Sequence, residues 1–465
     1  MTEGLRIDGR QVRRRAPFLP RLLCAALLMA AGIGATRAAE SLTLEQAIAR
    51  AVQANPQLQS ERFTHDARAL ERGIARGRRY PTLDLGAAYT HSSEPGLVHP
   101  ITEPGVFPPL DKDIVNADLS LQLPLYAGGR LVAGESLAEH ETRGARQRLN
   151  SSAQALIFNV VATFARVLQL DELYAAQTRR LASLEAEAEQ IAHKISEGRA
   201  TRLEALRVKA QQSQARFDQA ATAQAMRDAR RLLAAYMDRE SIVQPLAPFS
   251  LDSIILPDSR RQAVQRAREI NPRMLQARAQ LGSAEDRLAI ARADQRPQVD
   301  LLATARDRLG SDWEGRDDWD VQLALSMPLF DAGIRKSRTD QANFERLSSK
   351  QQLRSVLNDV VAEVEAAFGD VTTTRTQVAA ARQGLAEADE ALRIETRRYR
   401  AGRGTITDLL SAEAARWEAV ATLNQAGFDV LVAQVRLLKA VGDLDAGTFG
   451  VQVPETTGWD EADKG

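Results

Sequence analysis

Apolar residues recur every three or four positions along two very long stretches of the chain, residues 130–195 and 333–400. Neither stretch contains proline. A repeat of about 3.5 residues places these side chains on one stripe of a helix, which a partner helix must cover. The pattern therefore predicts two unbroken helices, each about 100 Å long at about 1.5 Å per residue. In the second stretch the stripe is Leu353, Leu357, Val360, Val364, Ala367, Val371, Thr374, Val378, Ala381, Leu385, Ala388 and Leu392.

Each long helix is expected to end at a glycine, Gly198 or Gly402, after which the apolar pattern resumes. Two shorter helices are predicted to return alongside the long ones, at residues 201–236 and 405–441. The chain therefore has two helical hairpins.

Four other segments alternate apolar and polar side chains, as β-strands with one apolar face do. They are predicted at about 82–90, 117–126, 298–307 and 318–330, with residues 91–115 as a loop. No spare amphipathic helix covers their apolar faces, and a length of about ten residues fits a transmembrane strand. Because open edges are not tolerated in lipid and barrels begin at about eight strands, several copies must share one barrel. Three copies would give twelve strands.

The order helix–strand–strand–helix occurs twice. Asn55 and Pro56 return 216 residues later as Asn271 and Pro272, whereas Gly198 returns 204 residues later as Gly402. The shorter offset indicates a shorter loop between the second pair of strands. The predicted domains are a first repeat at 39–237, a linker at 238–257, a second repeat at 258–444 and a polar, disordered tail at 445–465.

Composition excludes several kinds of function. The 61 basic and 61 acidic side chains balance, which does not favour a nucleic-acid partner. One cysteine and five histidines leave no disulfide and no cysteine–histidine metal cluster. No phosphate-binding glycine loop, nucleophile elbow or His-Glu-x-x-His motif is present. We therefore expect no enzyme activity, catalytic residue, metal or cofactor.

Residues 1–38 have the pattern of a secretory signal. A basic segment at Arg13–Arg15 precedes an apolar run, Leu22–Gly34, which is too short to span a membrane. Small residues then lead to a predicted cleavage near Ala38. Cys24 lies near the start of the apolar run and not at its end, which argues against lipidation.

The ordered set of signal, duplicated unit and two short motifs resembles the TolC family of outer-membrane efflux and secretion channels over about residues 40–444. The motifs are Leu123-Pro124-Leu125-Tyr126-Ala127-Gly128-Gly129 and Tyr399-Arg400-Ala401-Gly402, the latter leading into Thr405-Ile406-Thr407-Asp408-Leu409-Leu410. The resemblance implies a mainly α-helical homotrimer, with a twelve-stranded β-barrel in the outer membrane of a Gram-negative bacterium and a long α-helical barrel through the periplasm. It also implies a passive conduit of a tripartite efflux pump or type I secretion system, with a periplasmic adaptor and an inner-membrane transporter as partners.

The turns of the two hairpins are the candidate functional site. Gly198 and Gly402 are expected in the left-handed conformation, and Thr201 and Thr405 as N-caps with Glu204 and Asp408 as capping-box partners. The resemblance also implies that the turns bind the adaptor and form a periplasmic gate. The implied docking residues are Gly198, Arg199, Thr201, Gly402, Gly404 and Thr405, and the implied gate residues are Glu204, Tyr399, Asp408 and Arg403.

The gate differs from the family pattern in two places. Gly404 occupies the position where the family often carries an arginine, and Arg403 precedes it; Ser411 occupies a second, usually acidic position. The Tyr399 hydroxyl, across the turn from Asp408, could hold the second hairpin inward. At this point, capping alone and capping combined with gating both stay open.

Two other interpretations use the same long helices. A periplasmic adaptor also has a long helical hairpin, but it has one hairpin and lacks four amphipathic strands. A structural coiled-coil protein of the envelope would not need the strands. The sequence does not indicate which substrate is transported.

Overall fold

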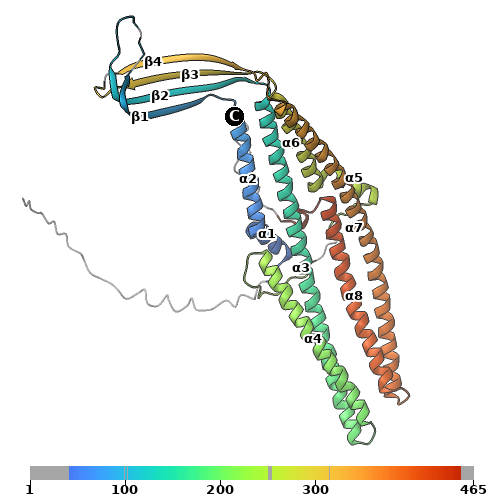
Figure 1. Ribbon diagram of the computed structural model, residues 1–465. Coiled ribbons are helices and arrows are strands. Elements are labelled where there is room, and N and C mark those ends of the chain that lie inside the picture. The colour runs from blue at the N-terminus through green and yellow to red at the C-terminus, as the bar shows by residue number, and fades with distance from the viewer. Residues whose placement is uncertain (1–40, 99, 102, 250–253, 314, 452–465) are drawn as a thin grey trace, which may run out of the picture. The chain divides into compact units, whose positions relative to one another are not determined.

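A computed structural model describes residues 41–98, 100–101, 103–249, 254–313 and 315–451 (Figure 1). The predicted signal at 1–38 and the end of the predicted tail, 452–465, lie outside the described residues. From Leu42 onward the described residues pack as one unit.

This unit contains the same order of elements twice. The first set is α1 (Leu44–Ala54), α2 (Pro56–Gly77), β1 (Thr82–Leu97), β2 (Leu110–Ala127), α3 (Arg130–Ser196) and α4 (Arg202–Tyr236). The second set is α5 (Arg260–Ile270), α6 (Pro272–Ala293), β3 (Gln298–Leu309), β4 (Gly315–Ser326), α7 (Ile334–Arg400) and α8 (Ile406–Val441). The helices α2 and α6 have 22 residues each, and α3 and α7 have 67 each, so the two halves keep the same helical framework.

The two longest helices begin directly after a glycine in the left-handed conformation, Gly129 before α3 and Gly333 before α7. Glycine adopts this conformation without the steric cost that other residues have. All twelve stripe positions of α7 are buried or half-buried, whereas most positions between them are exposed. The helices α6 and α8 pack against α7, so the seven-residue pattern is the packing surface of this helix.

The largest apolar cluster lies where α1, α3, α4 and α8 meet. Phe164 on α3 is fully buried at its centre and contacts the ring of Phe249 edge-on, with 5.6 Å between the ring centroids. One window of α3 has a mean hydropathy of 1.4, apolar enough for a membrane span, but 56% of it is buried inside the protein. The apolarity of α3 is therefore that of a core helix.

The prediction of a disordered tail from residue 445 is wrong for residues 445–451. A short 3-10 helix, η1 (Gly447–Phe449), follows α8, and Ala446 and Val451 join the large apolar cluster. These apolar side chains give the segment enough buried surface to pack, which its polar residues obscured in the sequence.

The four strands form one antiparallel sheet in the order β1-β2-β3-β4, at the end of the helices away from the hairpin turns (Figure 1). The register places polar residues in rows: Asp84 pairs with Ser120, Ser120 with Thr304 and Thr304 with Asp320. The neighbouring row is Leu85, Leu119, Ala305 and Trp319. Because side chains alternate between faces, one face of the sheet is polar and the other apolar.

Several strand boundaries differ from the predicted ones. β1 continues to Leu97 and β2 begins at Leu110, so most of the predicted loop at 91–115 is paired, with an irregularity between His91 and Gly96. Its polar side chains pair across the strands, since Asp113 accepts a hydrogen bond from Tyr89 at 2.6 Å. β3 likewise runs on to Leu309, because Arg308 reaches across to Asn116 on β2.

The fourth strand lies earlier in the chain than the sequence pattern predicts. It was predicted at 318–330 but spans Gly315–Ser326. Pro328 cannot donate to a strand ladder, and its carbonyl accepts a hydrogen bond from the Arg335 side chain at 2.6 Å instead. This contact belongs to the turn into α7.

Candidate functional site

The two hairpin turns, residues 197–201 and 401–405, are called the hairpin tips, and both have the same helix-ending geometry. Gly198 and Gly402 have φ of 73° and 70°. Each glycine amide donates to a carbonyl of the last helical turn, and the following residue reaches one residue further back: Arg199 to Lys194 at 2.8 Å and Arg403 to Arg398 at 2.9 Å. This is the Schellman arrangement, which satisfies carbonyls that the helix end would leave unpaired.

The returning helices start with reciprocal capping boxes, as the sequence predicts. The Thr201 hydroxyl accepts from the Glu204 amide at 3.3 Å, while a Glu204 carboxylate oxygen accepts from the Thr201 amide at 3.3 Å. Thr405 and Asp408 repeat the arrangement at 3.2 Å in both directions. The hydrogen bonds from Thr405, with the nearby Arg398 charge, hold the pKa of Asp408 below its usual range. Both acidic residues therefore have a local structural role.

Tyr399 lies at the end of α7, half-buried in the apolar cluster that joins the two hairpins. The ammonium group of Lys194 on α3 lies 4.6 Å from the centre of its ring, a cation–π contact between the hairpins. Burial and the negative charges of Glu204 and Glu187 raise the pKa of Tyr399. The structure brings Tyr399 near Glu204 and bonds Asp408 to Thr405. The contact that Tyr399 makes between the hairpins is the one with Lys194 on α3.

Side chains of both hairpins hold the tips side by side. A guanidinium nitrogen of Arg207 on α4 contacts the Thr407 hydroxyl on α8. Beneath this contact, Ile191 of α3, Val208 of α4 and Ile406 of α8 share one buried apolar cluster. The two tips therefore lie at the same end of the helices (Figure 1) and are joined by these contacts.

The positions that depart from the family pattern have separate roles. Gly404 lies against the end of α7, where an added Cβ would be 3.1 Å from the Tyr399 amide nitrogen. The Arg403 side chain is exposed and, among the described residues, no ion pair is found for it. Arg199 on the first tip pairs with Glu197 at 3.0 Å. The tips thus expose Arg199 and Arg403 near Glu204 and Asp408, whose carboxylates complete the capping boxes.

A group of partly buried charges lies about two to five turns above the tips, between α3 and α8. Burial, with the Glu413 carboxylate nearby and Lys194 acting in the opposite direction, raises the pKa of Glu187 to about 7. Burial also raises the pKa of Glu413, and the charge of Arg180 opposes this. The Arg180 guanidinium lies 5.4 Å from the centre of the Trp417 ring and 3.9 Å from Asp218 on α4. Two carboxyl groups with raised pKa therefore lie between the two hairpins.

Sequence reasoning missed these groups. Glu187, Glu413 and Lys194 carry no motif, and single charges on a long helix are usually solvated. The spacing offered one usable signal, since Arg180, Glu187 and Lys194 recur every seven residues beside the apolar stripe of α3. Which carboxylates they approach depends on the pairing of α3 with α8, which the sequence pattern does not specify.

Comparison with known proteins places this geometry among outer-membrane channels. The family model described as outer membrane efflux protein matches residues 47–238 and 263–443. The outer membrane efflux protein BepC of Brucella suis is 24% identical over 93% of this chain and 92% of its own length. The alkaline protease secretion protein AprF of Pseudomonas aeruginosa is 26% identical over 85% of this chain and 83% of its own. The crystal structure of VceC from Vibrio cholerae superposes with a TM-score of 0.73 at 19% identity, covering 86% of this chain and 96% of that one.

The raised pKa of Glu187 predicts that the stability of the packing between the hairpins depends on pH. Its pKa is near 4.5 in the unfolded chain and about 7 in the folded protein, so folding favours the protonated form. The stabilisation is complete below about pH 4.5 and is lost as the pH rises to about 7. We expect the thermal unfolding temperature to fall over this interval in the wild type and to fall less in Glu187→Gln. Circular dichroism of the detergent-solubilised protein, recorded during heating at each pH, would measure these unfolding temperatures.

The matched control is Glu189→Gln, because Glu189 is two residues away on the exposed side of the same helix. It should keep the wild-type pH slope. Equal slopes in the wild type and both variants would show that Glu187 is solvated and charged throughout this interval.

Proposed function

The chain belongs to the outer membrane efflux protein family and is an outer-membrane exit duct of the kind used in efflux and secretion, and we propose that three copies of it form one channel that ends in a gate at the hairpin tips. The observation that carries the trimer is the sheet, which has four strands and two edges, β1 and β4, without a partner strand among the described residues. Within lipid each unpaired backbone group costs several kcal/mol, so the edges have to pair with strands of other copies. Three copies close a barrel of twelve strands, within the range of known barrels.

The faces of the sheet support a barrel that encloses water. Leu83, Leu85 and Trp319 are exposed on the apolar face, at 63%, 80% and 73%. The opposite face carries Asp84 and an ion pair between Arg306 and Asp320 at 3.0 Å. An apolar outside and a charged inside suit a channel that passes polar cargo across the membrane.

We propose that the hairpin tips bind a periplasmic adaptor, through which an inner-membrane transporter delivers the cargo. Channels of this family work within such tripartite systems. The docking residues proposed from the sequence lie together on exposed turns: Gly198, Arg199, Thr201, Gly402 and Thr405, with Gly404 half-buried beside them. The alternatives of an adaptor or a structural coiled-coil protein give way to the channel, because the family match covers both repeats and the four strands form one sheet.

We propose that Glu204, Tyr399, Asp408 and Arg403 form the gate. In a trimer the two acidic residues of each chain would bring six carboxylates to one end of the helical barrel. Their repulsion is offset by the helix N-termini that they cap and by the positive charge of Lys194 beside Tyr399. Because Tyr399 connects α7 to α3, its contact would hold the second hairpin toward the first when the gate is closed.

We also propose that the signal is removed near Ala38 and that no lipid is attached. The intact mass of the protein from purified outer membranes should correspond to a chain that starts close to Ala39. A mass that retains Cys24 with acyl chains would contradict this proposal.

The assembly predicts that the protein fractionates with the outer membrane and cross-links as a trimer. Lysine-reactive cross-linking in mild detergent should give species of up to three chains, because every β1 and β4 edge has a partner strand once three copies have joined. Recovery of monomer and dimer alone, or recovery in the soluble periplasmic fraction, would argue for one of the alternative functions.

The gate predicts that Tyr399→Phe combined with Asp408→Ala raises single-channel conductance in a planar bilayer without lowering the trimer yield. The aromatic ring stays, but the hydroxyl and one carboxylate per chain are lost from the constriction. Replacing the capping residue also costs about 1 kcal/mol of stability.

Thr405→Ala separates the cap from the gate, because it removes the capping hydroxyl and keeps the Asp408 carboxylate. It should lower stability by a similar amount while conductance stays at the wild-type value. Unchanged conductance in the double variant, together with reduced stability, would leave these residues with a capping role only and place the constriction elsewhere.

A further inference from the structure

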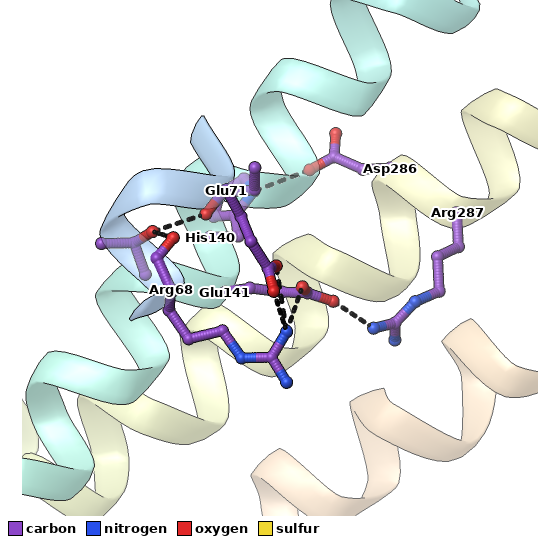
Figure 2. Close-up of polar contacts among 8 residues, drawn as sticks. Arg68, Glu71, His140, Glu141, Asp286 and Arg287 are labelled. Carbon is purple, nitrogen blue, oxygen red and sulfur yellow. Dashed lines mark hydrogen bonds and ion pairs between the residues drawn. The ribbon is translucent and has the colours of Figure 1, made fainter. Parts of the chain in front are cut away.

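Within one chain, the helices α3 and α6 meet along a polar seam (Figure 2). The Nδ1 atom of His140 on α3 lies 2.7 Å from a carboxylate oxygen of Asp286 on α6, and the Ser136 hydroxyl donates to the same oxygen at 3.0 Å. The His140 ring lies against Gly282, where an added Cβ would be 2.6 Å from the ring. Polar groups and a close backbone approach therefore specify how α3 packs on α6.

A second layer of charges extends this seam to α2. Glu141 accepts from Arg287 of α6 at 2.6 Å and lies 3.7 Å from Arg68 of α2. Arg68 also pairs with Glu71 on its own helix at 2.9 Å, as Figure 2 shows. The three helices α2, α3 and α6 are thereby connected within one chain.

The repeat gives each residue of this seam a counterpart. The operation that carries α2 and α3 onto α6 and α7 preserves their lengths, 22 and 67 residues. If three chains share one barrel, the same operation carries α6 and α7 onto α2 and α3 of the next copy. The contact of α3 with α6 should then recur as a contact of α7 with α2 of the neighbouring chain.

The counterparts of the His140–Asp286 pair are apolar. On α7 the position of His140 is taken by Phe344, and on α2 the position of Asp286 is taken by Leu70. Phe63 on α2 takes the position of Ala279, which packs on the α3–α6 seam. The polar pair of His140 and Asp286 is thus replaced by two large apolar side chains where a second copy would lie.

These apolar side chains are largely exposed in the described part of the chain. Phe344 is 68% exposed, and on α2 Phe63, Leu70 and Ile74 are 70%, 55% and 58% exposed. The α2 residues recur at intervals of seven and four, so they form one stripe along the helix. In the described chain α2 packs against α1 and α3, and α7 packs against α5, α6 and α8. The stripe on α2 and Phe344 on α7 therefore lie on sides of these helices that face away from their neighbours within the chain.

We propose that Phe344 of one copy packs between Phe63 and Leu70 of the next, so that the seam between chains has an apolar contact where the seam within a chain has the polar pair of His140 and Asp286. This inference rests on the proposed trimer. A seam within one chain forms as that chain folds, so its polar groups can be matched locally. Chains that meet by diffusion gain more from apolar side chains, whose association is favourable without exact geometry.

The charges around the proposed seam do not stabilise it, so the apolar side chains have to supply the attraction. The counterparts of the Glu141–Arg287 pair are Glu345 and Glu71, which would face each other with like charge. Both already have partners within their own chain, Gln341 for Glu345 at 2.9 Å and Arg68 for Glu71. Asp66 and Asp340 take the positions of Gly282 and Ser136 in the seam, and Asp66 lies 3.0 Å from His65.

The repeat also identifies a residue pair for disulfide cross-linking. A Cβ at Gly144 would lie 3.7 Å from the Cβ of Ala279, a separation suited to a disulfide. The counterparts are Ser348 on α7 and Phe63 on α2, both exposed. Cys24 is the chain's one cysteine, so Cys24→Ser provides a cysteine-free background.

We expect Ser348→Cys combined with Phe63→Cys to oxidise into a covalent trimer on a non-reducing denaturing gel. The control pair Gly144→Cys with Ala279→Cys should close a disulfide within each chain and leave the denatured protein at the mass of a monomer. Ser348→Cys combined with Phe217→Cys, an exposed position on α4, should give no cross-link.

A second variant tests the chemistry of the seam. Phe344→Asp should abolish the detergent-stable trimer, whereas Phe344→His with Leu70→Asp rebuilds the polar pair and should restore it. A trimer that is intact in Phe344→Asp and forms no disulfide in the Ser348 and Phe63 pair would overturn the inference and leave the proposed function standing. A wild-type chain that is monomeric in detergent would overturn both.

Discussion

The backbone groups at the two free edges of the four-stranded sheet constrain the whole molecule. In water they could bond to solvent, but within lipid they have to bond to other strands, and the described residues of this chain supply none. β1 and β4 are therefore unfinished until other copies pair with them. The apolar face beside them, with Leu85 and Trp319 exposed, is likewise stable only in contact with lipid. The oligomer is thus part of the fold.

The helices that follow the sheet also depend on it for their positions. The sheet fixes where α3 and α7 start, and the seven-residue stripes pack these helices, of 67 residues each, against their neighbours. A long helix without a break transmits position well, so the hairpin tips keep a defined place relative to the barrel. That rigidity concentrates any movement at the contacts between hairpins, where Lys194, Tyr399 and the buried carboxyl groups of Glu187 and Glu413 lie.

The sequence predicted most of this framework because the framework is periodic. Seven-residue spacing located α3 and α7, period-two alternation located the strands, and the repeated Asn-Pro and glycine positions showed the duplication. The capping boxes at Thr201 and Thr405 were predictable because capping depends on residues three positions apart. Strand ends were not, since the polar residues from His91 to Asp113 pair across strands, a long-range contact that local alternation does not record. The pairing of Glu187 with Glu413 was hidden for the same reason, because it depends on which helices become neighbours.

The central claim is that this chain becomes a closed channel only by repeating its own unit around an axis through three copies. Electron microscopy of the purified protein in lipid nanodiscs tests it most directly. The account predicts a threefold particle in which twelve strands form one barrel and six helical hairpins form one tube below it, with α7 of each copy beside α2 of the next. A particle of one chain with its four-stranded sheet closed on itself, or a ring with another number of copies, would contradict the account.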